Sequence, residues 1–299
     1  MADFAEIKIT SLQEFLVRTQ DFSEKPGWIF RGEEELPGPV LQLQSALERY
    51  CVDNQFDLGD VGYHEYLLTR EFRRRAHHYL TDLPDDTDYL EWWSLMRHYG
   101  APPRLLDWAY SIYVATYFAL EKKPEPNNSH IVWAIDLDWA AKASRELLRK
   151  VSKNRGHQVQ LFLEGPMELN HSKCFFDVFL KEPFVACAYP LTPFRLNERL
   201  TIQKGLFLIP GDITKPFKAN LMKFSNYQNK NKFVKIMISS ELRKDILGHL
   251  LQMNISRATL FPDLDGFAKS LGVYNYYMTD RLRDKYVDKW KWPEPNSRM

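Results

Sequence analysis

The stretch RHYGAPPRLLDW, from Arg97 to Trp108, sets charged and titratable side chains around a double proline. Two successive prolines cannot lie inside a helix, and each ring fixes its own φ. The pattern therefore predicts a helix before the prolines, a rigid polar turn, and a second helix in the apolar run that follows Ser111. A turn that is both polar and rigid is either an internal clamp or the edge of a site.

Outward from this turn, strand and helix patterns alternate without a regular βαβ order. Short apolar or alternating runs bounded by glycine or polar residues predict strands, and a capping side chain before a 3.6-residue periodicity predicts a helix. We expect strands at 27–32, 130–137, 183–189, 205–209 and 232–238. We expect helices at 12–19, 62–80, 88–98, 111–121, 137–151 and after Ser239. This mixture predicts an α+β fold.

Composition bounds the class of protein. The 299 residues are 44% hydrophobic and 14% aromatic, which is enough for one large core or two small ones. Lys and Arg total 40 against 39 Asp and Glu, so no global field attracts nucleic acid. The scattered Cys51, Cys174 and Cys187 favour a reducing cytoplasm over a disulfide framework. We expect no signal peptide and no membrane span.

One local basic stretch stands out against this neutral average. TREFRRRAHH, from Thr69 to His78, lies on a predicted helix. Most charge runs of this kind are the solvated face of a helix. The same arginines could instead contact phosphates, so both interpretations stay open.

Arg31 is the first candidate site residue. It ends the short apolar strand pattern WIF and precedes Gly32, which allows close approach of a ligand or another backbone. A strand delivers its last side chain to the end of a sheet, where clefts form. The alternative is a structural ion pair with Asp107 or Glu198.

Two further clusters contain polar and charged side chains that are candidate site residues. Arg104 presents a planar fork of donors that suits a phosphate or a carboxylate, and Asp107 could hold either Arg104 or a ribose hydroxyl. Arg195 and Arg199 would share a face if their segment is helical, and Gln203 then offers an amide before a strand. No GxGxxG, Walker lysine, HExxH or GxSxG pattern is present, so we predict no metal site.

Together these clusters resemble the FRG domain family, which is named after the sequence that stands here as Phe30-Arg31-Gly32. RHYGAPPRLLDWAYSIYVATYFA (97–119) is similar to the family motif QHYGLPTRLLDWT and its following helix. RLTIQKGLF (199–207) is similar to RLxxQxGxF, and TLFPDLDGFAKSL (259–271) to the C-terminal signature. This copy departs at four positions, with Arg97 for glutamine, Pro103 and Ala109 for threonine, and Ile112 for proline.

The resemblance implies a fold and a set of roles. FRG domains are distantly similar to the ADP-ribosyltransferase superfamily, which implies a single α+β domain with a split β-sheet flanked by helices, and NAD as co-substrate without a metal. The expected organisation is an N-terminal helical segment packing on the core (1–26), the FRG domain (27–275) and a C-terminal tail (276–299). Implied catalytic residues are Arg31, His98, Asp107 and Gln203, and implied cofactor-binding residues are Arg31, Gly32, Arg104 and Arg199.

Asp107 is the candidate for the catalytic carboxylate. Transfer from NAD passes through an oxocarbenium-like ribose centre that a nearby carboxylate stabilises. The superfamily supplies a third-motif glutamate, where this chain has Gln203, so Asp107 is the substitute carboxylate.

The implied function is that of a cytoplasmic toxin or effector of a prokaryotic toxin–antitoxin or phage-defence system. It would transfer ADP-ribose from NAD to RNA, DNA or protein, and an antitoxin partner would restrain it. The alternatives are an NAD glycohydrolase and a non-catalytic nucleotide-sensing or nucleotide-binding module. A purely structural role ranks last.

Overall fold

A computed structural model describes residues 4–34, 43–122, 129–152, 159, 162–163, 168–169 and 172–272. The predicted tail at 276–299 lies outside these residues. Eight strands form one mixed sheet in the order β1-β8-β4-β2-β3-β7-β6-β5. The strands are β1 (Ala5–Ile9), β2 (Trp28–Glu34), β3 (Leu106–Ala109), β4 (His130–Asp136), β5 (Glu168–Leu169), β6 (Ala188–Pro193), β7 (Gly205–Pro210) and β8 (Phe233–Ile238). The predicted α+β class is confirmed.

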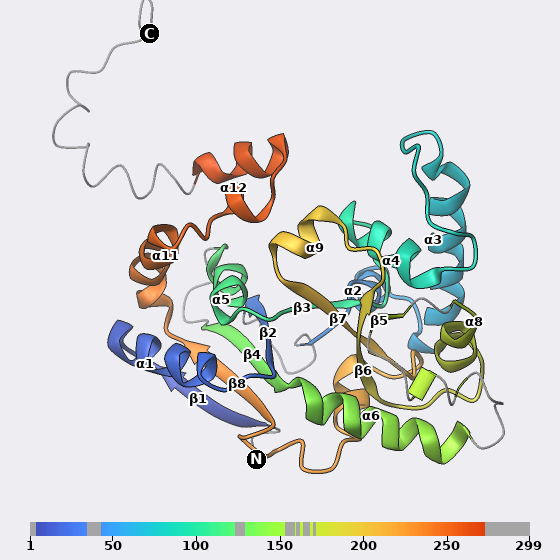
Figure 1. Cartoon of the computed structure of the whole chain (residues 1–299), viewed down its shortest axis with the longest axis horizontal. Helices are drawn as coiled ribbons and strands as arrows, with labels where there is room; N and C mark the ends of the chain where they lie inside the picture. Colours follow the sequence, from blue (N-terminus) through green and yellow to red (C-terminus); the bar gives the residue numbers. More distant parts are fainter. Residues whose placement is uncertain are drawn as a thin grey trace, which may run out of the picture.

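The sheet is nearly divided between β2 and β3. β2 pairs with β4 over its whole length, from Trp28 to Glu34, but it pairs with β3 only through Phe30 and Ala109. β3 in turn pairs with β7 throughout. The four strands β1, β8, β4 and β2 therefore meet the other four at a single point, and the strands diverge beyond it (Figure 1).

Helices cover both faces of the sheet. They are α1 (Leu12–Ser23), α2 (Ala46–Asp53), α3 (Val61–Ala76), α4 (Tyr89–His98), α5 (Ile112–Leu120), α6 (Leu137–Ser152), α8 (Ser172–Phe175), α9 (Glu198–Ile202), α10 (Phe217–Leu221), α11 (Arg243–Gln252) and α12 (Arg257–Leu260). Side chains alternate along β4, with Ile131 and Trp133 in one buried cluster and Val132 and Ala134 in the other. Within the described ranges, no helix is long and apolar enough to cross a membrane.

The helices around the double proline begin as the sequence predicts. The Asp88 side chain accepts a hydrogen bond from the Glu91 amide at 3.0 Å, and the Ser111 hydroxyl caps α5 through the amide of Val114. Between them the chain forms the short strand β3, which we did not predict. Its four residues are too few for a clear alternation, and its pairing with β7, and at one position with β2, defines it.

Other boundaries differ from the sequence prediction. The 183–189 segment is not a strand throughout, because β6 begins only at Ala188. The predicted N-terminal helical segment also contains β1, which pairs in parallel with β8. α3 ends at Ala76, four residues earlier than we expected. Strand pairing and burial decide these positions, and neither is a local property of the chain.

Gly32 allows the closest packing of helix on sheet. A Cβ at this position would lie 1.9 Å from the Ala115 carbonyl oxygen and 2.5 Å from the Ala119 nitrogen, both in the backbone of α5. We expect Gly32→Ala to lower the free energy of unfolding by about 3 kcal/mol, because backbone cannot move aside as a side chain can. Urea unfolding measures this loss, and a loss under about 1 kcal/mol would contradict the packing argument.

Gly62 supplies the matched control for this prediction. It lies near the start of α3, and a Cβ there would meet nothing within 4 Å. Gly62→Ala is therefore expected to stabilise the protein by about 0.4–1 kcal/mol, since alanine restricts the unfolded chain.

Candidate functional site

A cavity of about 200 Å³ lies where β2 and β3 diverge. Its lining brings together the first three sequence motifs, which are far apart in the chain. Five predicted site residues line it, namely Arg31, Gly32, Asp107, Arg199 and Gln203. Their convergence makes this cavity the candidate functional site.

Arg31 bridges the gap between the two halves of the sheet. Its Nε donates to Glu33 Oε1 at 2.8 Å, and its Nη1 donates to the Asp107 carbonyl oxygen at 2.8 Å. Glu33 Oε2 accepts from the Leu43 amide and from Trp133 Nε1, both at 3.0 Å. Both oxygens of Glu33 are therefore engaged, and this carboxylate holds Arg31 in place.

Asp107 pairs with Arg97 rather than with Arg104. Arg97 Nε and Nη2 lie 2.7 Å and 2.6 Å from Asp107 Oδ2, and Arg31 Nη1 lies 4.0 Å away. Burial would raise the pKa of Asp107, but Arg97, Arg31 and Arg199 outweigh it and hold the pKa below its ordinary value. Asp107 is therefore a carboxylate at neutral pH, with a side chain that is 36% exposed.

Arg199 and Gln203 reach the cavity from α9. The Arg199 guanidinium lies 4.3 Å from the centre of the Phe261 ring, and its burial lowers its pKa. Gln203 follows the helix, and its Nε2 donates to the Leu260 carbonyl at 3.0 Å. This bond joins the third motif to the fourth. Arg195 precedes α9 and is exposed, so the two arginines do not share a helical face.

His98 lies beside the cavity rather than in it. It lines a small adjoining space together with Asp107, Arg199 and Gln203. Among the described residues, nothing hydrogen-bonds its buried Nδ1. Burial, and then the charge of Arg199, lower the pKa of His98, so the imidazole is neutral at pH 7.

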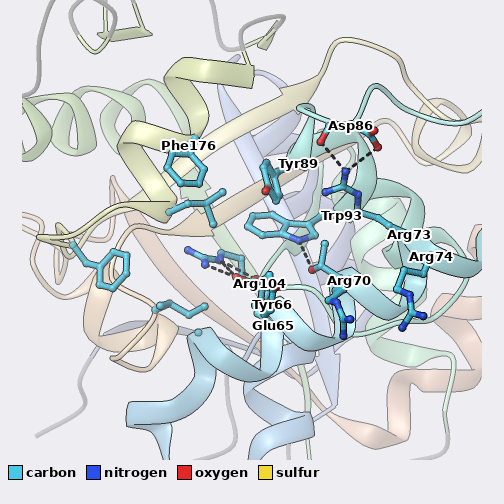
Figure 2. Close-up of a pocket in the computed structure, with 15 residues that line it drawn as sticks. Glu65, Tyr66, Arg70, Arg73, Arg74, Asp86, Tyr89, Trp93, Arg104 and Phe176 are labelled. Atoms are coloured by element: carbon cyan, nitrogen blue, oxygen red, sulfur yellow. Dashed lines mark hydrogen bonds and ion pairs between the residues drawn. The ribbon is translucent and has the colours of Figure 1, made fainter.

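Arg104 is the predicted site residue that the structure separates from the others. Its guanidinium donates to both oxygens of Glu65 and to the Phe179 carbonyl, and it lies over the Trp93 ring (Figure 2). Both charged side chains are almost fully buried. Arg104 precedes β3, whereas Asp107 lies within the strand. Asp107 therefore lines the cavity, and Arg104 does not.

Two residues near the cavity were not predicted as site residues. Arg97 was noted only as a departure from the family motif, although it forms the closest ion pair of the site. Arg49 on α2 has a pKa that burial lowers first, followed by the charges of Arg31 and Arg97. The sequence gives no signal for Arg49, because no motif surrounds it. For Arg97 the available signal was its position directly before His98, in the last turn of α4.

The charges of this cluster favour an anionic ligand. Three arginines line the cavity, Arg31, Arg97 and Arg199, with one carboxylate, Asp107, among the lining residues. Glu33 pairs with Arg31 from outside the lining, and three minus two leaves an excess of one positive charge. Glu121 also acts on Arg199, but it pairs with Arg257. Burial lowers the pKa of Arg199, and an anion beside its guanidinium would compensate for this loss of solvation. A diphosphate meets this requirement.

Comparison with known families supports the first two motifs. A family model of the FRG domain matches residues 26–128, which include Arg31, Arg97 and Asp107. The third and fourth motifs lie beyond the matched residues, so the extension of the domain to residue 275 stays a prediction. Comparisons with curated proteins and with solved structures found no match. Over residues 26–128, about a third of its length, the chain is similar to the FRG domain family.

Proposed function

We propose that the chain is an NAD-dependent ADP-ribosyltransferase-like effector whose cavity between β2 and β3 binds the diphosphate of NAD. The observation that carries this proposal is the convergence of Arg31, Arg97 and Arg199 on one cavity beside Asp107. Arginine forks suit phosphate oxygens, and the three arginines of the lining outnumber Asp107 and Glu33, the carboxylates that pair with two of them.

The size of the cavity defines which part of NAD it holds. Sites that enclose ligands of drug size have volumes of about 300–1,000 Å³. The 200 Å³ here accommodates a diphosphate with an adjoining ribose. The bases would then lie outside this cavity.

The chemistry uses the two groups beside the arginines. The bond between ribose C1′ and nicotinamide breaks with its electron pair leaving on nicotinamide, and an acceptor oxygen or nitrogen forms the new bond to C1′. The Asp107 carboxylate stabilises the oxocarbenium-like centre, and the neutral His98 takes the proton of the acceptor. With water as acceptor, the same steps make an NAD glycohydrolase.

One observation favours a second function, binding without turnover. The charge of Asp107 is shared with Arg97 and Arg31, which weakens its field at a reacting ribose. Gln203, at the position of the usual glutamate, supplies no carboxylate. A nucleotide-sensing module would need the arginines but not the acid.

Two measurements on purified protein test the proposal. Calorimetry with NAD and ADP-ribose measures binding, and release of nicotinamide, with and without cell extract as acceptor, measures turnover. Arg199→Gln should weaken binding about tenfold or more, since one charge-assisted phosphate contact is lost. Arg195→Gln removes the same charge from an exposed position nearby and should leave binding unchanged.

The outcomes separate the two functions. Nicotinamide release that Arg199→Gln reduces supports the enzyme. Binding that depends on Arg199 without any release supports the sensing module. Absence of binding to both ligands overturns the proposal for this cavity.

Expression in a bacterium tests the cellular role. A cytoplasmic effector that consumes NAD should slow growth, and Arg31→Ala should relieve this, because Arg31 both binds the ligand and joins the sheet halves. Equal growth with the two proteins, at equal soluble amounts, would contradict the role as a toxin. An antitoxin partner, if the genome encodes one beside this chain, should restore growth on co-expression.

A further inference from the structure

A second and larger cavity, of about 670 Å³, lies apart from the arginine cavity of the FRG motifs. It opens between α3, α4 and the segment that follows α8 (Figure 2). None of the residues that line the first cavity lines this one. We call it the α3 cavity.

One wall of the α3 cavity is a single face of α3. The helix contributes residues 62, 65, 66, 69, 70, 73 and 74 to the lining. These positions recur at three and four residues, so they form one stripe about 18 Å long. A wall of this length suits an extended ligand better than a compact one.

Three arginines line the outer part of this wall. Arg70 and Arg74 have side chains that are 48% and 60% exposed, and both share Glu71, at 3.3 Å and 2.9 Å. Arg73 pairs with Asp86 at 2.9 Å. Arg75 also contacts Glu71, at 3.2 Å, but does not line the cavity. One carboxylate therefore serves three guanidinium groups, which leaves positive charge at the mouth.

Aromatic side chains lie next to these arginines. Tyr66 and Phe176 are 61% and 45% exposed, although large aromatic side chains gain most from burial. The rings of Tyr89 and Phe176 lie 6.2 Å apart, and Tyr89 is equally far from Trp93. Figure 2 shows the arginines on one side of the cavity and Phe176 on the other. A ligand with a flat apolar part and a charged part matches this arrangement.

The inner end of the cavity is rigid. Glu65 and Arg104 form their buried ion pair there, and Trp93 Nε1 donates to Thr69 Oγ1 at 3.0 Å. Fixed charged and hydroxyl groups at the end of an aromatic slot can meet the polar edge of a nucleobase.

We propose that the α3 cavity binds single-stranded nucleic acid, with one or two bases stacked against Tyr66 and Phe176 and the backbone phosphates on Arg70 and Arg74. Interleaved arginines and aromatic rings are the combination that holds unpaired strands, because every base has a flat face and every nucleotide a phosphate. A duplex keeps its bases stacked inside and cannot place them in the cavity. The site lies outside the proposed NAD cavity, and binding here does not depend on NAD chemistry.

Fluorescence anisotropy with labelled 12-nucleotide strands of RNA and of DNA tests this proposal. Tyr66→Ala should weaken binding about 5- to 100-fold, as loss of a stacking platform does elsewhere. The double variant Arg70→Ala/Arg74→Ala should weaken binding and lower the slope of log K against log salt by about 1.4, at about 0.7 for each phosphate contact. Circular dichroism confirms that these exposed substitutions leave the fold intact.

Matched controls come from the same helix. Arg75→Ala removes an arginine with the same Glu71 partner, and Tyr63→Ala removes a tyrosine that is 63% exposed, yet neither residue lines the cavity. Both should bind like the unaltered protein.

Each result bears on the proposal. Preference for RNA or for DNA identifies the kind of strand. The proposal is overturned if neither the RNA nor the DNA strand binds at low salt. It is also overturned if a duplex binds as tightly as a single strand, or if Arg75→Ala and Tyr63→Ala weaken binding as much as the cavity variants do. Because the assay contains no NAD, its failure leaves the proposed function of the first cavity standing, and failure of NAD to bind leaves this site standing.

Discussion

Replacing Arg104 by methionine is expected to lower the free energy of unfolding by about 3–5 kcal/mol, because it leaves the buried Glu65 carboxylate without its cation. The side chains of Arg104 and Glu65 are only 3% and 4% exposed. Arg104 also donates to the Phe179 carbonyl at 2.9 Å and lies 4.9 Å above the Trp93 ring. Urea unfolding, followed by tryptophan fluorescence, measures the loss.

The double variant Arg104→Met/Glu65→Leu is the informative control. Removing both charges leaves no buried ion unpaired, so it should recover much of the stability that the single change loses. A single variant that loses less than about 1 kcal/mol would mean that water or another cation reaches Glu65.

Arg104 also separates two interpretations of the second motif. The family resemblance places it on NAD, whereas the structure places it on Glu65 at the end of the α3 cavity. NAD affinity should therefore be unchanged in Arg104→Met at a temperature where the variant is folded. A tenfold loss of NAD affinity there would favour the resemblance over the structure.

Asp107→Asn is expected to raise the affinity for NAD about tenfold while it lowers nicotinamide release about 10²- to 10³-fold. The carboxylate repels a diphosphate and partly neutralises Arg97 and Arg31, so its loss frees positive charge for the ligand. The same loss removes the group that stabilises the oxocarbenium-like centre. Calorimetry and nicotinamide release measure the two effects on one sample.

Because the expected changes in NAD affinity and in nicotinamide release have opposite signs, this prediction distinguishes the enzyme from the sensing module. A sensing module would bind NAD more tightly in Asp107→Asn and would release no nicotinamide with either protein. Weaker binding in Asp107→Asn would contradict the role of the arginines as diphosphate ligands, and would mean that Asp107 itself holds the ligand through a ribose hydroxyl. Asp138→Asn changes an exposed carboxylate on α6 and should alter neither quantity.

Much of the local structure could be predicted from short-range signals. The caps Ser11, Asp88 and Ser111 begin helices where we expected them, since a cap and its amide lie three residues apart. β4 and β8 show the apolar patterns of buried strands, and in the structure each has a neighbouring strand on both sides. The sequence left Asp107 and Glu198 open as partners of Arg31, and the structure places Arg31 against Asp107.

The remainder depended on contacts between distant segments. The sequence by itself determined the α+β class, the main helices, and the motifs that carry Arg31, Asp107, Arg199 and Gln203, because periodicity, caps and motif spacing are local. Only the tertiary structure decided that Arg97 pairs with Asp107 and that Arg104 pairs with Glu65, 39 positions away. An arginine fork fits any carboxylate, so its partner is selected by which chain segments the sheet and helices bring together.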